Sequence, residues 1–225
     1  MKPKFIFLAL FVFVEVGPIH GQYLHPKISA KQIQIRKVVM LPAKVEIVRQ
    51  SMKGPEGMAA ESDMLSTRVS QLTSEALAAK HIAVLAGTMP GTSEGDAQQK
   101  YRVADIQARY DALLPKIAKK RKDVKKGRFS LGDEVLNLNL DKSADAIVFI
   151  RGQGQKLTKG KTAFTLLVGG LPAYLQLTVG VVDAHTGEVL VFTNPLTRGD
   201  ATNANDRSLL KAIENSLKKL PPGGQ

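Results

Sequence analysis

The sequence predicts a single α/β (α+β) domain in which helices flank a mixed β-sheet. Short apolar runs alternate with amphipathic stretches, which is the order of strands and helices in such sheets. Further along, two apolar stretches joined by a turn sequence predict a hairpin, and a last amphipathic stretch follows them. The composition fits a folded domain, because 44% of the 225 residues are apolar and 23% are charged.

Residues 1–21 have the layout of a secretory signal peptide. Lys2 and Lys4 precede an unbroken apolar run, Phe5–Val14, and Gly21 offers a small residue for cleavage. This run is too short for a helix that crosses a bilayer, which needs about 20 residues. We therefore expect a periplasmic or secreted protein whose mature chain begins near Gln22 and has no transmembrane span. The alternative interpretation of this run is an uncleaved anchor or a buried strand.

In the first half of the mature chain, residues 22–36 are expected to form a flexible lead-in to a domain over 37–220. Apolar runs predict three short strands, at 38–41, 45–48 and 82–85. A loop is predicted at 54–57. Apolar residues that recur every three or four positions predict helices over 63–80 and 97–118, the second kinked or broken at Pro115.

In the second half, residues 146–150 give the clearest strand pattern, and three glycines (Gly152, Gly154 and Gly160) predict a loop after it. The uncharged stretch 162–182 is interpreted as a loop that leads into a half-buried strand. A turn at 183–188 and a returning strand at 189–192 complete the hairpin. The last helix covers 207–220 with an apolar stripe that includes Leu210, Ile213 and Leu217, and 221–225 form a tail.

Three segments of this pattern resemble, in the same order, those of uncharacterised exported bacterial proteins; they are Val38–Pro42, Ala144–Phe149 and Val182–Glu188. More remotely, the arrangement resembles the α/β domain of curli-secretion lipoproteins and the amino-terminal domain of the periplasmic Tol-B protein. The resemblance covers most of residues 37–220. It implies binding or assembly in the cell envelope, without catalytic residues. The chain lacks the lipid-bearing cysteine of the curli-secretion proteins, so the resemblance does not imply their membrane anchoring.

The composition excludes several kinds of chemistry. The chain has no cysteine, which rules out disulfides, thiolate metal sites, iron–sulfur clusters and a cysteine nucleophile. Export also disfavours reactions that need cytosolic ATP or NAD. We therefore predict no cofactor and no metal ion, and the sequence assigns no catalytic residue.

Three short motifs offer chemistry, and each has a structural alternative. Residues 91–95 match the G-x-S-x-G elbow of α/β-hydrolases, with Ser93 as nucleophile and His185 downstream, but the motif does not follow its strand directly. Residues 160–162 match the last three residues of the phosphate-binding P-loop motif, yet Gln155 occupies the position where that motif needs its first glycine. Asp183, His185 and Glu188 are close enough in sequence for a metal site, but the segment also fits a polar hairpin turn.

The strongest charge feature lies between residues 116 and 128, where eight cations face one acid, Asp123. The cations are Lys116, Lys119, Lys120, Arg121, Lys122, Lys125, Lys126 and Arg128. One interpretation is a solvated helix end and loop. The other is contact with an anionic lipid or polymer surface or with an envelope protein. Nucleic acid is a disfavoured partner for two reasons. No aromatic residue interleaves the run, and an exported protein is separated from the nucleic acids of the cytosol.

Together these features predict an exported, non-catalytic binding or assembly protein of the bacterial cell envelope. The basic run is its candidate contact. The alternative is a hydrolase that acts on an envelope polymer or ester, with Ser93 as its nucleophile.

Overall fold

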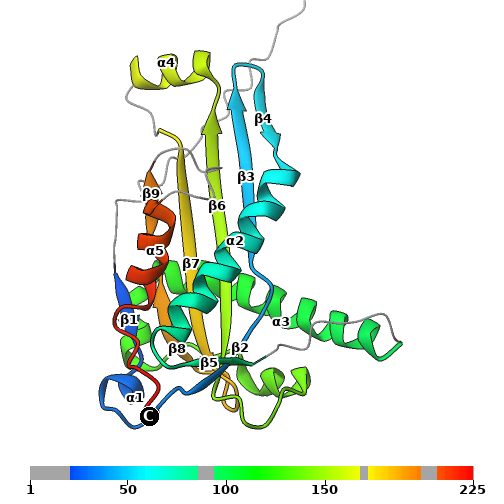
Figure 1. The fold of residues 1–225 in the computed structure, drawn as a ribbon, viewed down its shortest axis with the longest axis vertical. Helices are drawn as coiled ribbons and strands as arrows, with labels where there is room; N and C mark the ends of the chain where they lie inside the picture. The colour runs from blue at the N-terminus through cyan, green and yellow to red at the C-terminus, as the bar shows by residue number, and fades with distance from the viewer. Residues whose placement is uncertain (1–20, 86–93, 168–171, 199–206, 225) are drawn as a thin grey trace, which may run out of the picture.

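Two long strands, β6 (Ala146–Leu157) and β7 (Tyr174–Asp183), pair antiparallel and form the centre of the sheet (Figure 1). The computed structural model describes residues 21–85, 94–167, 172–198 and 207–224. These residues form one α/β domain with a mixed sheet of nine strands. The predicted fold class is therefore confirmed.

At the lower end in Figure 1, the sheet has the order β1-β8-β7-β6-β2-β5. The strands β2 and β5 run parallel to β6, whereas β8 and β1 continue the antiparallel part. Their bounds are β1 (Gln22–Leu24), β2 (Lys37–Met40), β5 (Ala83–Leu85) and β8 (Val189–Thr193).

At the upper end, other strands replace these neighbours. The parallel partner of β6 is here β3, which carries β4 on its outer side, and β9 pairs with β7. Their bounds are β3 (Lys44–Ser51), β4 (Gly54–Gly57) and β9 (Leu196–Arg198). The same two long strands therefore support both ends of the molecule.

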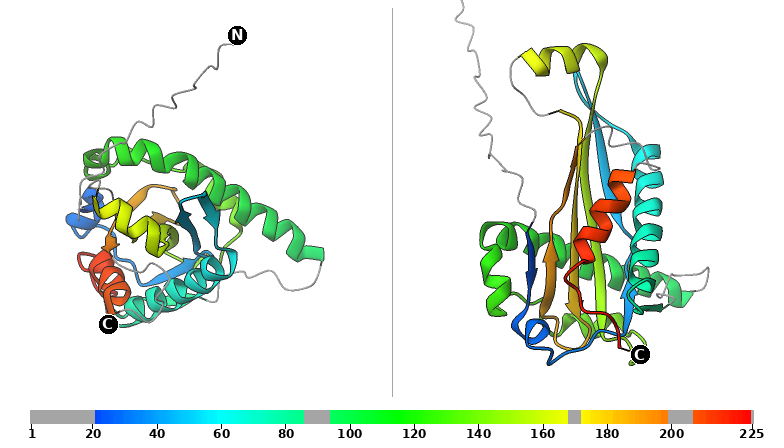
Figure 2. Two further views of the ribbon diagram at one scale, coloured as in Figure 1. Left: turned by 90° about the horizontal axis from the view of Figure 1, so that it is seen from above. Right: turned by 60° about the vertical axis from the view of Figure 1, so that its left-hand side comes forward.

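Helices cover the two faces unequally (Figure 2). One face carries α2 (Ala59–Ala78) and α5 (Arg207–Leu217) along much of its length. The other carries α3 (Glu94–Lys119) at the lower end, with the 3₁₀ helices η1 (Arg121–Lys126) and η2 (Gly132–Leu138). Two short helices complete the described elements, α1 (Pro26–Ser29) and α4 (Lys159–Leu167).

The alternation of side chains along β6 divides the core in two. Val148 and Ile150 belong to the cluster on the α2 and α5 side, whereas Ile147 and Phe149 belong to the cluster on the α3 side. Because side chains of a strand alternate between its faces, an unbroken apolar run predicts burial on both sides. The apolar clusters explain why this strand was the clearest in the sequence.

The expectation of a flexible lead-in at 22–36 is wrong. Residues 22–24 form β1, which pairs antiparallel with β8, and Ile28 of α1 is buried in the core. The side-chain amide of Gln22 donates to the carbonyl of Ser216 at 2.7 Å and accepts the N–H of Lys219 at 2.7 Å. A strand of three residues is too short to show a period, so it cannot be predicted from the residue pattern.

The glycines after Ile150 do not form a loop, because β6 continues through Gly152 and Gly154 to Leu157. A Cβ atom on Gly152 would lie 2.9 Å from both methyl groups of Val45 on the neighbouring strand. The glycine therefore permits close packing between strands. The third predicted loop glycine, Gly160, lies in α4.

Three further expectations differ from the structure. The predicted loop at 54–57 is β4, paired with β3. Pro115 does not break α3, which continues to Lys119, and the kink predicted there stays a prediction. In α5 the buried residue is Leu209, 2% exposed, rather than Leu210, which is 36% exposed. Ile213 and Leu217 are buried as predicted.

Candidate functional site

The cationic run at 116–128, here called the basic segment, begins in the last turn of α3, continues through η1 and ends at Arg128. Two buried apolar side chains, Ile117 and Val124, attach it to the core on the α3 side. Gly127 ends η1 with φ +63°, a conformation that glycine adopts without strain. The backbone of the segment is therefore held by the fold, although its cations point outward.

The charges of the basic segment are poorly compensated by its own acid. Asp123 lies 3.5 Å from the ammonium of Lys126 and 3.7 Å from the guanidinium of Arg128. The other cations of the segment have no carboxylate of a described residue within ion-pair distance; they are Lys116, Lys119, Lys120, Arg121, Lys122 and Lys125. All eight are exposed except Arg121, which is half-buried and donates to the carbonyl of Ala118. The segment therefore presents a net positive surface.

The first residues of the described chain hold this segment in place. The 3₁₀ helix η1 packs on β1 and β8, and the ammonium of Lys125 lies 5.8 Å from the ring centroid of Tyr23. Next to them, His25 is 4% exposed, and its Nε2 atom fills the space beside Gly127. Strand β1 and helix α1 are thus the support of the basic segment.

His25 is buried and caps α1 with its imidazole. Its Nδ1 accepts the backbone N–H of Lys27 at 3.2 Å, which caps α1. Burial lowers the pKa of His25 below 6.5, against the opposing charges of Glu188 and Asp183, and Lys27 lowers it further. The ammonium of Lys27 is itself paired with the carboxylate of Glu188. Protonation of His25 would remove the acceptor of the cap.

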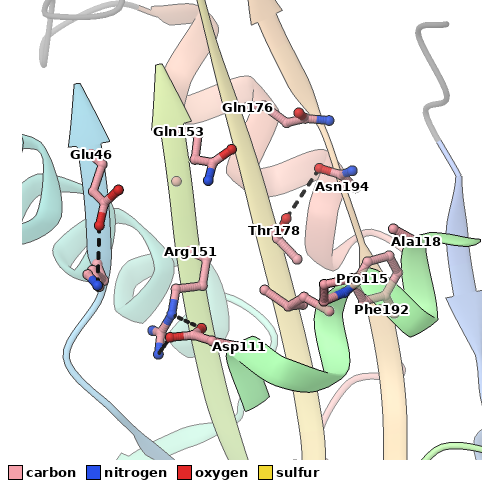
Figure 3. A pocket seen from close by; sticks show the side chains of 13 residues that line it. Glu46, Asp111, Pro115, Ala118, Arg151, Gln153, Gln176, Thr178, Phe192 and Asn194 are labelled. Carbon is pink, nitrogen blue, oxygen red and sulfur yellow. Dashed lines mark hydrogen bonds and ion pairs between the residues drawn. The ribbon is translucent and has the colours of Figure 1, made fainter. Parts of the chain in front are cut away.

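A second feature, which sequence reasoning missed, is a cleft of about 370 Å³ between the last turns of α3 and the sheet (Figure 3). It lies where the α3 helix ends and the polar upper part of the same sheet face begins. We call it the amide cleft, after three side chains that line it: Gln153, Gln176 and Asn194. The signal in the sequence is the alternation of polar residues with glycines after Ile150, a pattern that also predicts the loop expected there.

Strand register places the lining side chains of the amide cleft in two rows. Arg151 of β6 stands opposite Lys44 of β3 on one side and Thr178 of β7 on the other. In the next row Gln153 stands between Glu46 and Gln176. Leu114, Pro115 and Ala118 of α3 form an apolar wall beside these rows.

The charged groups of the amide cleft are paired with one another. Nε of Arg151 donates to Asp111 at 2.5 Å, and its Nη1 donates to the carbonyl of Ile150 at 3.0 Å. The ammonium of Lys44 lies 3.2 Å from the carboxylate of Glu46. Thr178 donates to the amide oxygen of Asn194 at 3.3 Å.

The motif residues give no support to hydrolysis or metal binding in the described part. Ser93 and the rest of residues 91–93 lie outside the described residues. The carboxylate of Asp183 accepts the backbone N–H groups of His185 and Thr186, both at 2.8 Å, as a turn requires. Glu188 pairs with Lys27 instead. No cluster of three or more His, Cys, Asp or Glu residues that could hold a metal occurs in the ranges that the structure describes.

The hairpin turn at 183–188 is confirmed, with Gly187 at φ +69°. A Cβ atom there would lie 2.3 Å from the carbonyl oxygen of Gly132.

Residues 160–162 lie in α4 rather than in a loop. Within the uncharged stretch 162–182, residues 162–167 lie in α4 rather than in the predicted loop, residues 174–182 lie in β7 as predicted, and residues 168–171 lie outside the described residues. None of the described helices is long and apolar enough to cross a membrane. The predicted signal peptide, except Gly21, lies outside the described residues.

Comparison with known proteins adds little to these observations. No family model matches the sequence, and no curated protein matches it. Among solved structures, a PelC dodecamer from Paraburkholderia phytofirmans is similar with a TM-score of 0.42 and 11% identity, over 92% of this chain and 99% of that one. The lipoprotein GNA1162 from Neisseria meningitidis is similar with a TM-score of 0.36 and 11% identity, over 82% of this chain and 95% of that one. The family to which the chain belongs stays a prediction.

Proposed function

We propose that the protein is an exported, non-catalytic binding or assembly protein of the bacterial cell envelope, and that the basic segment is its contact with an anionic surface. The observation that carries this proposal is a group of four exposed lysines that have no carboxylate partner among the described residues: Lys116, Lys119, Lys120 and Lys122. Export rests on the layout of residues 1–21.

The arrangement of the segment suits adsorption to such a surface. Each Lys or Arg near an anionic membrane contributes about 1 kcal/mol, so several uncompensated charges in one segment give useful affinity. The anchors Ile117 and Val124 fix the backbone, so binding does not have to order a free chain. The attraction is screened over about 8 Å at physiological salt, which confines it to direct contact.

Cosedimentation with vesicles tests this function. The mature protein, residues 22–225, should sediment with phosphatidylglycerol-containing vesicles and remain in solution with pure phosphatidylcholine vesicles. Replacing Lys116, Lys119, Lys120 and Lys122 by Gln should release it from the anionic vesicles. The fold should survive, because these side chains are exposed and form no ion pair with another described residue.

A matched control removes the same number of charges elsewhere. The four exposed lysines chosen lie outside the basic segment: Lys142, Lys211, Lys218 and Lys219. Their replacement by Gln changes the net charge equally and should leave most of the sedimentation intact. If both quadruple variants lose binding to the same degree, net charge rather than the basic segment is responsible, and the proposal is wrong.

A further inference from the structure

We propose that the amide cleft binds a neutral, hydroxyl-rich ligand with the chemistry of a glycan chain. The cleft borders the basic segment, which contributes Ala118 to its wall, but the inference does not depend on the function proposed for that segment. The inference rests on four properties of the cleft: its charge balance, its unengaged amides, its lack of a free strand edge and its apolar wall.

The charge balance favours a neutral ligand over a strongly charged one. Both cations of the cleft already face a carboxylate, Arg151 with Asp111 and Lys44 with Glu46. Arg151 is 8% exposed and also donates to the Ile150 carbonyl, so its donors are directed into the protein. An anionic or cationic ligand would compete with the partner that each of these groups already has, whereas a neutral ligand leaves both pairs intact.

The neutral polar groups offer matched hydrogen bonding. Gln153 and Gln176 are direct neighbours across the β6–β7 pair, and both side chains extend from the sheet into the cleft (Figure 3). Within the described part of the chain, neither amide makes a hydrogen bond to another protein group. Each amide has two donors and an acceptor oxygen, and a sugar hydroxyl both donates and accepts. A pair of adjacent amides therefore suits adjacent hydroxyl groups.

An extended peptide fits the cleft less well than a glycan. Peptides that add to a sheet pair with a free strand edge, but β6 is paired with β3 on one side and β7 on the other along this part. The cleft thus offers side chains and no backbone ladder. Beside the amides, Leu114, Pro115 and Ala118 form a wall against which the C–H groups of a sugar ring can pack.

Titration of the ¹⁵N-labelled mature protein by NMR tests the proposal. The probes are three neutral oligosaccharides (cellohexaose, maltohexaose and N-acetylchitohexaose), one polyuronate oligomer and one neutral Gly/Ser/Asn peptide. We expect at least one neutral sugar to shift the side-chain amide signals of Gln153 and Gln176 in a saturable manner. Because the cleft charges are paired, added salt should leave this affinity unchanged, unlike vesicle binding.

Variants connect the signals with the cleft. Gln153→Ala combined with Gln176→Ala should weaken sugar binding about tenfold or more. Gln98→Ala removes an exposed amide on α3 outside the cleft and should not change it. Thermal unfolding of each variant checks that the fold is intact, and the double variant should still sediment with anionic vesicles.

Three results would overturn the proposal. The first is the absence of saturable shifts with every neutral sugar at millimolar concentration. The second is sugar binding that the double variant retains in full. The third is stronger binding of the peptide or the polyuronate than of any neutral sugar at the same amide signals.

Discussion

Two neighbouring leucines of α5 provide a matched test of how this helix packs. Leu209 is 2% exposed and belongs to the core cluster on the α2 and α5 side, whereas Leu210 is 36% exposed. Each can be replaced by Ala, which removes the same atoms from the same helix and leaves helix propensity high. The two variants therefore differ mainly in the burial of the side chain that is lost.

The expected difference is large. Leu→Ala in a core reduces the free energy of unfolding by about 2–5 kcal/mol, and 1 kcal/mol corresponds to about 2–4 °C in Tm for a chain of this size. Leu209→Ala should therefore lower Tm by about 4–20 °C. Leu210→Ala should change the free energy of unfolding by about 0.5 kcal/mol or less, as most exposed substitutions do.

Differential scanning calorimetry and urea titration of the mature protein measure both variants. Equal losses of Tm would refute the assignment of Leu209 to the core. A larger loss for Leu210→Ala would show that α5 is rotated relative to the structure described here. The same measurement on Ile213→Ala, a buried position of the same face, gives the loss of Tm to expect when a buried side chain of this helix is removed.

Other predictions concern buried polar groups. The hydroxyl of Tyr110 is fully buried without a hydrogen-bond partner in the described part of the chain, and burial raises the pKa of this phenol well above its usual range. Tyr110→Phe should keep the ring stacked on Phe149 and raise Tm by a few degrees in calorimetry; a lower Tm would show that the hydroxyl is engaged. Burial holds the pKa of His25 in the folded protein below 6.5, its ordinary value in the unfolded chain. Between the folded and the unfolded pKa the unfolded chain therefore binds more protons, so the free energy of unfolding should fall as pH drops below about 6.5. His25→Asn should reduce this pH dependence in urea titrations between pH 7 and 5, and an unchanged slope would contradict the assignment. Asp111→Asn leaves the guanidinium of Arg151 without its carboxylate and should lower the free energy of unfolding by about 1.5–3 kcal/mol, whereas an unchanged urea midpoint would show that the pair is not formed.

The parts of the fold that could be predicted from the sequence are those with a strong local period. The unbroken apolar runs at 38–41 and 146–150 are strands because both of their faces are buried. What the sequence did not show depends on neighbours distant along the chain. Gly152 resembles a loop residue until Val45 on β3 is placed against it. Whether Leu209 or Leu210 is the buried leucine depends on how α5 is rotated about its axis, and one residue corresponds to about 100° of that rotation.

Of the two candidate sites, the basic segment could be predicted from the sequence and the amide cleft could not. The basic segment is contiguous in sequence, so its charge can be predicted without the structure, whereas its support by β1 and α1 cannot. The amide cleft combines residues from β3, α3, β6 and β7, and no local pattern links Glu46 with Gln176. Such a site becomes visible only when the register of the strands is known.

The affinity of the protein for anionic vesicles, measured as a function of salt, tests the central claim most directly. Four lysines at about 1 kcal/mol each predict that the Gln variant at positions 116, 119, 120 and 122 partitions about 1,000-fold more weakly than the unsubstituted protein at low salt. Rising salt should reduce the affinity of the unsubstituted protein toward that of the variant. Equal partitioning of the two proteins, or an affinity that salt does not change, would contradict the claim that the basic segment binds an anionic surface.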